Sequence, residues 1–134
     1  MTSAKTVLLF GTFDGLHDGH RFFLSEARKL GTRLIASVAQ DSTVERFKKH
    51  PPKHLLAERM TKLLQSGLVD EAAPGDTELG NFTAVQNCKP DIIALGYDQT
   101  KLEVKLREFI TKERLPVVIQ KIPLSTIAAS IRVP

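Results

Sequence analysis

Short apolar runs alternate along the chain with stretches in which apolar residues recur every three or four positions. An uninterrupted apolar run is typical of a strand buried in a parallel sheet, whereas the wider spacing indicates an amphipathic helix. The pattern predicts strands at residues 6–10, 34–38, 69–73, 91–95 and 116–121. It predicts helices at residues 21–30, 41–47, 54–66, 82–88, 101–113 and 125–132.

Polar and conformationally restricted residues mark the expected element ends. Asp41 or Ser42 is expected to cap the second helix with its side chain. Pro51 and Pro52 break regular structure, so residues 48–53 are expected to form a loop, and Pro74-Gly75 a turn.

Strands that alternate with helices at this spacing predict an α/β fold with a doubly wound, Rossmann-like parallel sheet. We expect five strands in the order 3-2-1-4-5, helices on both faces and a single domain over residues 1–134. Ligands of such sheets bind outside the carboxyl ends of the strands. The residues that follow strands one, two, four and five are therefore the informative ones.

The composition is that of an ordinary globular domain, with 42% hydrophobic and 25% charged residues among 134. This excludes a coiled coil, a fibrous repeat and a disordered tail. No apolar run approaches the roughly 18 residues of a membrane span, and the first apolar stretch is too short for a secretory signal. A lone cysteine, Cys88, excludes an internal disulfide and a cysteine-rich metal site. We therefore expect a cytoplasmic protein without a membrane partner.

The positive charge is mild, since 19 Lys and Arg stand against 15 Asp and Glu. A nucleic-acid binder usually carries basic runs interleaved with aromatic residues. This chain has no Trp, one Tyr and only short basic pairs such as Lys48-Lys49, so no nucleic-acid partner is expected. The excess positive charge either lies on a solvated surface or attracts a small polyanion, such as a nucleotide, into a basic cleft.

The segment that follows the first strand carries the densest chemistry. Gly11 permits close approach of the backbone, and Thr12 adds a hydroxyl beside free backbone N–H groups. Gly19 and His20 stand where the next helix begins, and a helix N-terminus favours an anion. His17 and His20 are three residues apart and share one side of a helical turn. Together these features predict a phosphate site.

Three other interpretations of this segment remain open at the level of sequence. The two histidines could bind a metal with Asp14 or Asp18 as a further ligand. Either histidine could be a structural residue, and the glycine-rich stretch could be an ordinary turn between strand and helix. We favour the phosphate site and expect no metal held by the protein.

Gly11-Thr12-Phe13-Asp14 followed by His17-x-Gly19-His20 resembles the signature of the cytidylyltransferase-like nucleotidyltransferases, with their HxGH motif. Three weaker segments agree with this resemblance. They are residues 91–99, Arg59 with residues 69–71, and Ser125-Thr126.

The Ser/Thr motif that the family carries near the end of its sequence can be aligned with this chain in two registers. In one, Lys121 replaces an arginine of the cytidylyltransferases and Ser125-Thr126 lies under the triphosphate. In the other, Ser130-Ile131-Arg132 resembles the ending of adenylyltransferases.

The resemblance implies that a phosphate monoester attacks the α-phosphorus of a nucleoside triphosphate and pyrophosphate leaves. A monoester is already anionic, so the protein must mainly position the substrates and stabilise charge. The resemblance implies that His17 and His20 are catalytic, donating hydrogen bonds to the α-phosphate and to the departing oxygen. A Mg²⁺ ion carried by the triphosphate is the expected cofactor.

The expected binding residues follow the strand ends and the basic loop. Asp98 is placed to bond a ribose or a base amino group and Tyr97 to stack on a ring, although a turn-forming Asp and a packed Tyr are the alternatives. The nucleotide-binding candidates are Gly11, Thr12, Phe13, Gly19, Gly96, Tyr97, Asp98, Ser125 and Thr126. The candidates for binding phosphate or acceptor are Asp14, Lys48, Lys49, Arg59, Lys121 and Arg132.

The segment Leu95-Gly96-Tyr97-Asp98-Gln99 resembles the archaeal-type FAD synthases, in which Leu-Gly-x-Asp-Gln recurs. Glycerol-phosphate cytidylyltransferases usually carry Trp at the position of Gln99. This resemblance favours ATP over CTP and FMN as the acceptor. The alternatives are a glycerol 3-phosphate cytidylyltransferase, a phosphopantetheine or sugar-phosphate adenylyltransferase, and a domain that binds a nucleotide without turnover. The expected partners are ATP or CTP, a phosphate-monoester acceptor and, as an option, a second copy of the chain.

Overall fold

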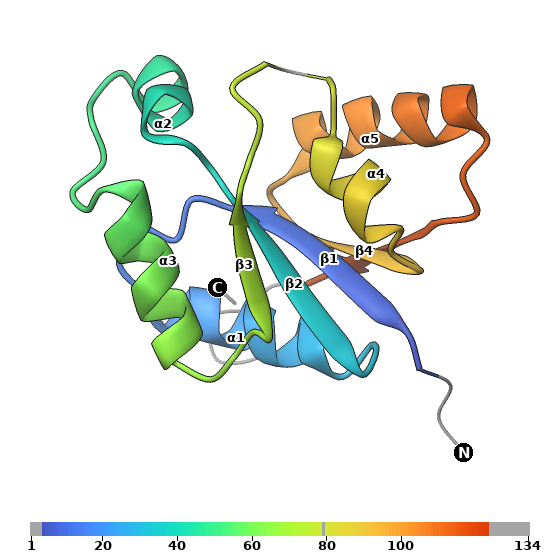
Figure 1. Ribbon diagram of the computed structural model, residues 1–134, viewed down its shortest axis with the longest axis horizontal. Coiled ribbons are helices and arrows are strands. Elements are labelled where there is room, and N and C mark those ends of the chain that lie inside the picture. Colours follow the sequence, from blue (N-terminus) through green and yellow to red (C-terminus); the bar gives the residue numbers. More distant parts are fainter. Residues whose placement is uncertain (1–3, 79, 124–134) are drawn as a thin grey trace, which may run out of the picture.

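The computed structural model describes residues 4–78 and 80–123, which form one parallel sheet in the strand order β3-β2-β1-β4-β5. Figure 1 shows β1 in the centre of this twisted sheet. The predicted topology is confirmed. The strands are β1 (Thr6–Gly11), β2 (Arg33–Val38), β3 (Glu71–Pro74), β4 (Ile92–Gly96) and β5 (Val118–Ile122).

Helices cover both faces of the sheet, as predicted. They are α1 (Asp18–Arg28), α2 (Asp41–Lys48), α3 (Leu56–Gln65), α4 (Thr83–Cys88) and α5 (Thr100–Glu113). In Figure 1, α1 and α3 lie on one side of the sheet and α4 and α5 on the other. None of the described helices is both long and apolar enough to cross a membrane.

The central strand supplies both halves of the core because successive side chains of a strand point to opposite faces. Val7 and Leu9 pack with residues of α1 and α3, whereas Leu8 packs with residues of α4 and α5. All three side chains are buried. Burial on both faces explains why β1 has the uninterrupted apolar sequence that predicted it.

The N-terminal ends of α1 and α2 differ from the prediction because of the hydrogen bonds that His17 and Asp41 make. α1 begins at Asp18, three residues earlier than expected, because the ring of His17 caps it. The predicted capping of α2 is wrong: Asp41 is already helical, Gln40 is the N-cap and no side chain caps this end. The carboxylate of Asp41 accepts a hydrogen bond from Arg59 instead. The predicted helix at 125–132 lies outside the described residues.

Candidate active site

A cavity of about 460 Å³ opens at the carboxyl ends of β1, β4 and β5, beside the first turn of α1. We call it the histidine cavity. It lies where β1 and β4 are neighbours and the order of strands reverses, which is where ligands bind in such sheets. Ten of the predicted site residues line it: Gly11, Thr12, Phe13, His17, Gly19, His20, Lys48, Gly96, Tyr97 and Asp98.

The ring of His17 closes the N-terminal end of α1. Its Nδ1 accepts hydrogen bonds from the backbone N–H of Gly19 at 3.1 Å and, less closely, of His20 at 3.4 Å. Because Nδ1 accepts, a neutral His17 carries its proton on Nε2. The sequence signal for a phosphate-binding histidine therefore coincides with an N-cap, and the cap fixes which nitrogen can donate.

Gly19 leaves room for this cap. A Cβ atom at position 19 would lie 3.0 Å from Cε1 and 3.2 Å from Nδ1 of His17. Gly19 is a predicted nucleotide-binding residue. The structure shows that its missing side chain also leaves space for the imidazole of His17, which caps α1.

His20 uses its ring nitrogens in the opposite way. Its Nδ1 lies 3.1 Å from the carbonyl oxygen of Gly15, which can only accept, so Nδ1 donates. A neutral His20 therefore has a free lone pair on Nε2. Burial lowers the pKa of His20 below its usual value, and the neighbouring His17 lowers it further. Without a bound anion the ring of His20 is consequently neutral near pH 7.

The imidazoles of His17 and His20 stack, with ring centroids 3.7 Å apart and planes inclined by 21°. The rings of Phe13 and His20 form a T-shaped pair with their centroids 5.5 Å apart. Phe13 is only 3% exposed and has a φ of 53°. A Cβ at Gly11 would lie 2.7 Å from its ring. The side chain of Phe13 thus supports the histidines, and its contact with a ligand is left to its backbone.

Gln99 joins the two strands that border the cavity. Its Nε2 donates to the carbonyl of Phe10 at 2.9 Å, and its Oε1 accepts from the N–H of Gly96 at 2.9 Å. Sequence reasoning used Gln99 to choose between substrates and left it out of the site. The structure shows a side chain that holds the ends of β1 and β4 together.

The prediction that Arg59 binds a phosphate is wrong, because its guanidinium is buried and hydrogen-bonded within the protein. Its side chain is buried, and Nε donates to the carbonyl of His54 at 2.9 Å. Nη1 donates to the carbonyl of Thr12 at 2.8 Å and Nη2 to the carboxylate of Asp41 at 2.7 Å. A guanidinium that is committed in this way has no access to a substrate. Arg59 instead anchors the Thr12 segment to α2 and α3.

Three further predicted candidates are not brought to the cavity lining. Asp14 accepts from the backbone N–H of Lys53 and His54, at 2.7 and 2.9 Å. Burial alone would raise the pKa of Asp14, but these two bonds lower it below its usual value. Lys121 pairs with Glu103 at 3.1 Å, and Lys49 is the exposed C-cap of α2. Lys48 lies inside the cavity. The candidates Ser125, Thr126 and Arg132 fall outside the described residues.

Phe22, Phe23, Ile122 and Pro123 also line the histidine cavity, and sequence reasoning missed them. Phe22 and Phe23 lie within the predicted helix at residues 21–30, and both also pack against the core as partly buried side chains. Their apolar character is therefore explained by the core, and no sequence signal marked them as cavity residues.

The described residues hold no group of three or more His, Cys, Asp or Glu side chains arranged for a metal ion. Nδ1 of both histidines is already engaged, and Asp98 brings one carboxylate to the lining. A Mg²⁺ ion is typically held by one or two carboxylates together with substrate phosphates. This donor set fits a metal ion that arrives with a triphosphate.

Known proteins share both the sequence and the fold. The family model described as "Cytidylyltransferase-like" matches residues 8–132. A protein of Methanosarcina barkeri named "FAD synthase" is 43% identical over 121 residues, which cover 89% of this chain and 84% of the relative. One of Ferroglobus placidus with the same name is 42% identical over 120 residues, which cover 88% and 76%.

The crystal structure of a lipopolysaccharide core biosynthesis protein from Thermoplasma volcanium superposes with a TM-score of 0.83 and 36% identity. It covers 92% of this chain and 99% of that one. Pantothenate synthetase from Thermus thermophilus shares the fold at a TM-score of 0.62 and 18% identity, over 97% of this chain and 62% of that one. The family model matches nearly the whole of this chain, and the two HxGH histidines lie together in one cavity. This chain therefore belongs to the cytidylyltransferase-like family.

Proposed function

We propose that this protein is an FMN adenylyltransferase, which forms FAD and pyrophosphate from ATP and FMN. The observation that carries the proposal is the stacked pair of His17 and His20 at the N-terminus of α1, in a cavity that Gly96, Tyr97 and Asp98 complete. The choice of substrates is supported by relatives named FAD synthase that are about 40% identical over most of this chain.

The reaction needs no nucleophile from the protein. An oxygen of the FMN phosphate attacks the α-phosphorus of ATP, the bond from that phosphorus to the bridging oxygen breaks, and pyrophosphate leaves with the electron pair. The FMN phosphate is already anionic near pH 7. The protein therefore contributes alignment of the two phosphates and stabilisation of the charge that develops between them.

The two histidines have different proposed tasks, which their hydrogen bonds support. Nε2–H of His17 is a fixed donor for the α-phosphate, because the helix cap holds the other nitrogen. Nε2 of His20 becomes a donor only after the ring takes up a proton, since Nδ1–H stays on Gly15. The charge of a bound triphosphate favours this uptake. Lys48 opposes it in the free protein, because its positive charge lowers the pKa of His20, and a bound triphosphate would neutralise that charge.

The ends of β4 and β5 are the proposed side for adenosine. Tyr97 is 48% exposed, so its ring is available to a base, and the carboxylate of Asp98 lies in the cavity lining. The Mg²⁺ ion is part of the substrate, as the complex with ATP. The cytoplasmic location and the homodimer remain predictions.

The test is the release of pyrophosphate from ATP with one acceptor at a time. The panel contains FMN, glycerol 3-phosphate, phosphopantetheine and heptose 1-phosphate, the last because the similar Thermoplasma protein belongs to lipopolysaccharide core biosynthesis. We expect turnover with FMN to exceed that with any other acceptor. A higher turnover with another acceptor would refute FMN as the substrate, and no release from ATP with any acceptor would refute adenylyl transfer.

A further inference from the structure

A second cavity, of about 250 Å³, adjoins the histidine cavity. We call it the phenylalanine cavity, after Phe10 and Phe82 in its lining. The two cavities share Phe10, Gly11, Thr12 and Gln99, so a ligand can extend from one into the other. Complete small-molecule sites usually measure about 300–1,000 Å³. The phenylalanine cavity is therefore of a size for part of a ligand.

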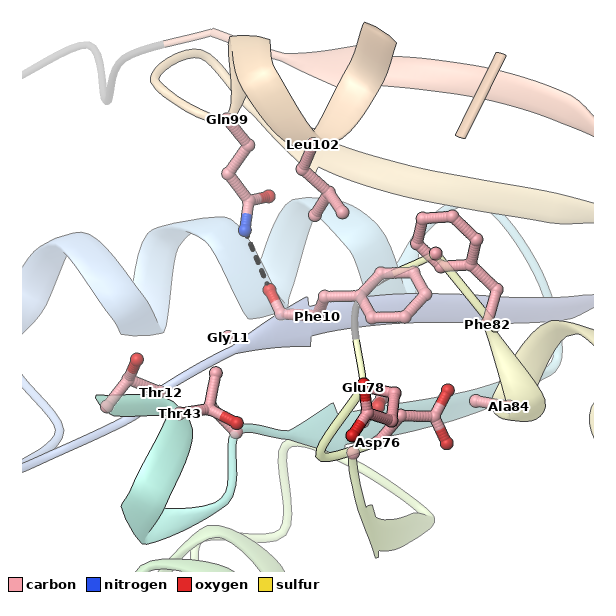
Figure 2. A pocket seen from close by; sticks show the side chains of 14 residues that line it. Phe10, Gly11, Thr12, Thr43, Asp76, Glu78, Phe82, Ala84, Gln99 and Leu102 are labelled. Carbon is pink, nitrogen blue, oxygen red and sulfur yellow. Dashed lines mark hydrogen bonds between the residues drawn. The ribbon is translucent and has the colours of Figure 1, made fainter. Parts of the chain in front are cut away.

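One wall of this cavity is apolar and aromatic. The rings of Phe10 and Phe82 meet edge to face, with centroids 6.2 Å apart and planes at 75°. Phe109 packs against Phe82 from behind at 5.2 Å and holds it in place. Figure 2 shows Leu102 beside the two rings, and Ala84 belongs to the same cavity lining. A fixed wall of this kind favours a flat, largely uncharged ring system.

The side chain of Thr43 lines the same cavity and carries a buried polar atom that lacks a partner among the described residues. The hydroxyl oxygen of Thr43 is buried, and within the described part of the chain nothing bonds to it. A buried hydroxyl without a hydrogen bond is destabilising, so such groups usually have a partner. A ring with polar atoms on its edge would supply the missing bond, whereas a hydrocarbon ring would not.

Charge sets the direction in which an acceptor can lie. Asp76 and Glu78 line the phenylalanine cavity and not the histidine cavity, which has Lys48, the two imidazoles and a single carboxylate, that of Asp98. Figure 2 shows both carboxylates opposite the aromatic wall. Carboxylates repel a phosphate, so the phosphate of an acceptor belongs in the histidine cavity and its uncharged end beside Phe10.

We propose that the phenylalanine cavity binds the isoalloxazine ring of the acceptor, between the Phe10–Phe82 wall and the hydroxyl of Thr43, with the phosphate directed past Thr12 to the histidines. This assignment rests on the proposed function, because it takes FMN as the acceptor. It gives the protein separate places for adenosine, at the end of β4, and for the flavin, at the ends of β1 and β2.

The first test blocks the cavity and leaves the histidines untouched. Ala84→Leu fills the space beside the rings, and Ala57→Leu makes the same change on the exposed side of α3 as a control. We expect the KM for FMN to rise about tenfold or more in Ala84→Leu, with the KM for ATP unchanged. An unchanged KM for FMN in this variant would overturn the assignment.

The second test removes the unpaired hydroxyl. Thr43→Val keeps the shape of the side chain, and Thr61→Val on α3 is the matched control. We expect the KM for FMN to rise about three- to tenfold in Thr43→Val only, as the loss of one hydrogen bond predicts. A KM for FMN that equals that of the wild type would show that Thr43 does not contact the flavin.

Lumiflavin, which has the ring without the ribityl phosphate, separates the ring site from the proposed function. We expect it to inhibit FAD formation in competition with FMN and not with ATP, and inhibition in competition with ATP would overturn the assignment. If the wild type forms no FAD, the proposed function fails. The ring site then stands if fluorescence shows that lumiflavin binds the wild type and not Ala84→Leu, and it falls if lumiflavin binds neither or both.

Discussion

His17 and His20 stack with their ring centroids 3.7 Å apart, yet their Nε2 atoms differ in protonation. Nδ1 of His17 accepts from the start of α1, and Nδ1 of His20 donates to Gly15. In the neutral rings, Nε2 therefore carries a proton in His17 and a lone pair in His20. One histidine is a permanent donor and the other becomes a donor by taking up a proton.

Two substitutions of His17 distinguish its role as the N-cap of α1 from its proposed role as a hydrogen-bond donor to the α-phosphate. Asn is a good N-cap residue but has no atom in the place of Nε2, whereas Ala provides neither. We expect both His17→Asn and His17→Ala to lower kcat by a factor on the order of 10². Only His17→Ala should also lose about 1 kcal/mol in the free energy of unfolding.

Steady-state kinetics and urea unfolding of these two variants check the prediction. Affinity for ATP should fall much less than kcat, because the bond matters most in the transition state. If His17→Asn has the kcat of the wild type, the ring serves only as a cap. Stoichiometric zinc that is lost with His17→Ala would favour a metal site instead.

The lowered pKa of His20 predicts proton uptake when a triphosphate binds. The free ring is neutral near pH 7, and the bound ring needs Nε2–H, so its pKa must rise in the complex. Affinity for a non-hydrolysable ATP analogue should then fall as the pH rises between these two pKa values. Calorimetry in buffers of different ionisation enthalpy measures the uptake directly.

His20→Gln is the matched variant for this experiment, because its amide N–H offers a donor near Nε2 without titrating. We expect proton uptake at pH 7.5 in the wild type to exceed that in His20→Gln, since only the histidine titrates. His20→Ala should lower kcat by a factor on the order of 10². Equal uptake by the wild type and His20→Gln would show that another group takes the proton.

The same pKa shift predicts that stability depends on pH. Burial lowers the pKa of His20 in the folded chain below its value of 6.5 in the unfolded chain, and His17 lowers it further. The unfolded chain then binds more protons between the two values, so stability is full above pH 6.5 and declines as the pH falls through that interval. Melting temperatures at pH 5 and pH 8 should therefore differ more in the wild type than in His20→Gln. An identical difference in both proteins would argue against a lowered pKa at His20.

Arg59 is expected to matter for stability and not for phosphate binding. Arg59→Met removes three hydrogen bonds and leaves the carboxylate of Asp41 unpaired, which for a buried pair typically costs about 3–5 kcal/mol. Asp41 is partly exposed, so the lower figure applies. Arg107→Met breaks a surface pair with Glu103 and should destabilise the fold far less than Arg59→Met. A raised KM for ATP or FMN without a loss of stability would restore the phosphate-binding interpretation.

Patterning over short distances was sufficient to predict the sheet. The buried strands β1 and β4 contain uninterrupted apolar runs, and the run of β2 is broken only by the small Ser37. The HxGH segment follows β1 directly, so both the topology and the place of the histidines could be predicted from the sequence. His17 shows the limit of such patterns. Its spacing from His20 indicated a shared face, but the capping bond that starts α1 early depends on the side-chain rotamer.

Contacts between distant segments could not be predicted in this way. Arg59 and Lys48 are both basic residues near one loop. In the folded chain Arg59 is buried and donates to the carbonyl of Thr12, whereas Lys48 lines the histidine cavity. Thr43 and Phe82 carry no motif at all. They become neighbours of Phe10 through the packing of α2 and α4 around the end of β1, which no local pattern specifies.

The most direct test of the proposed function is a competition in one reaction. The protein is given equal concentrations of ATP and CTP together with FMN and glycerol 3-phosphate, and the products are resolved by chromatography. We expect FAD as the main product. CDP-glycerol as the main product would contradict the proposed function, and would show that the segment from Gly96 to Gln99 serves a cytosine nucleotide.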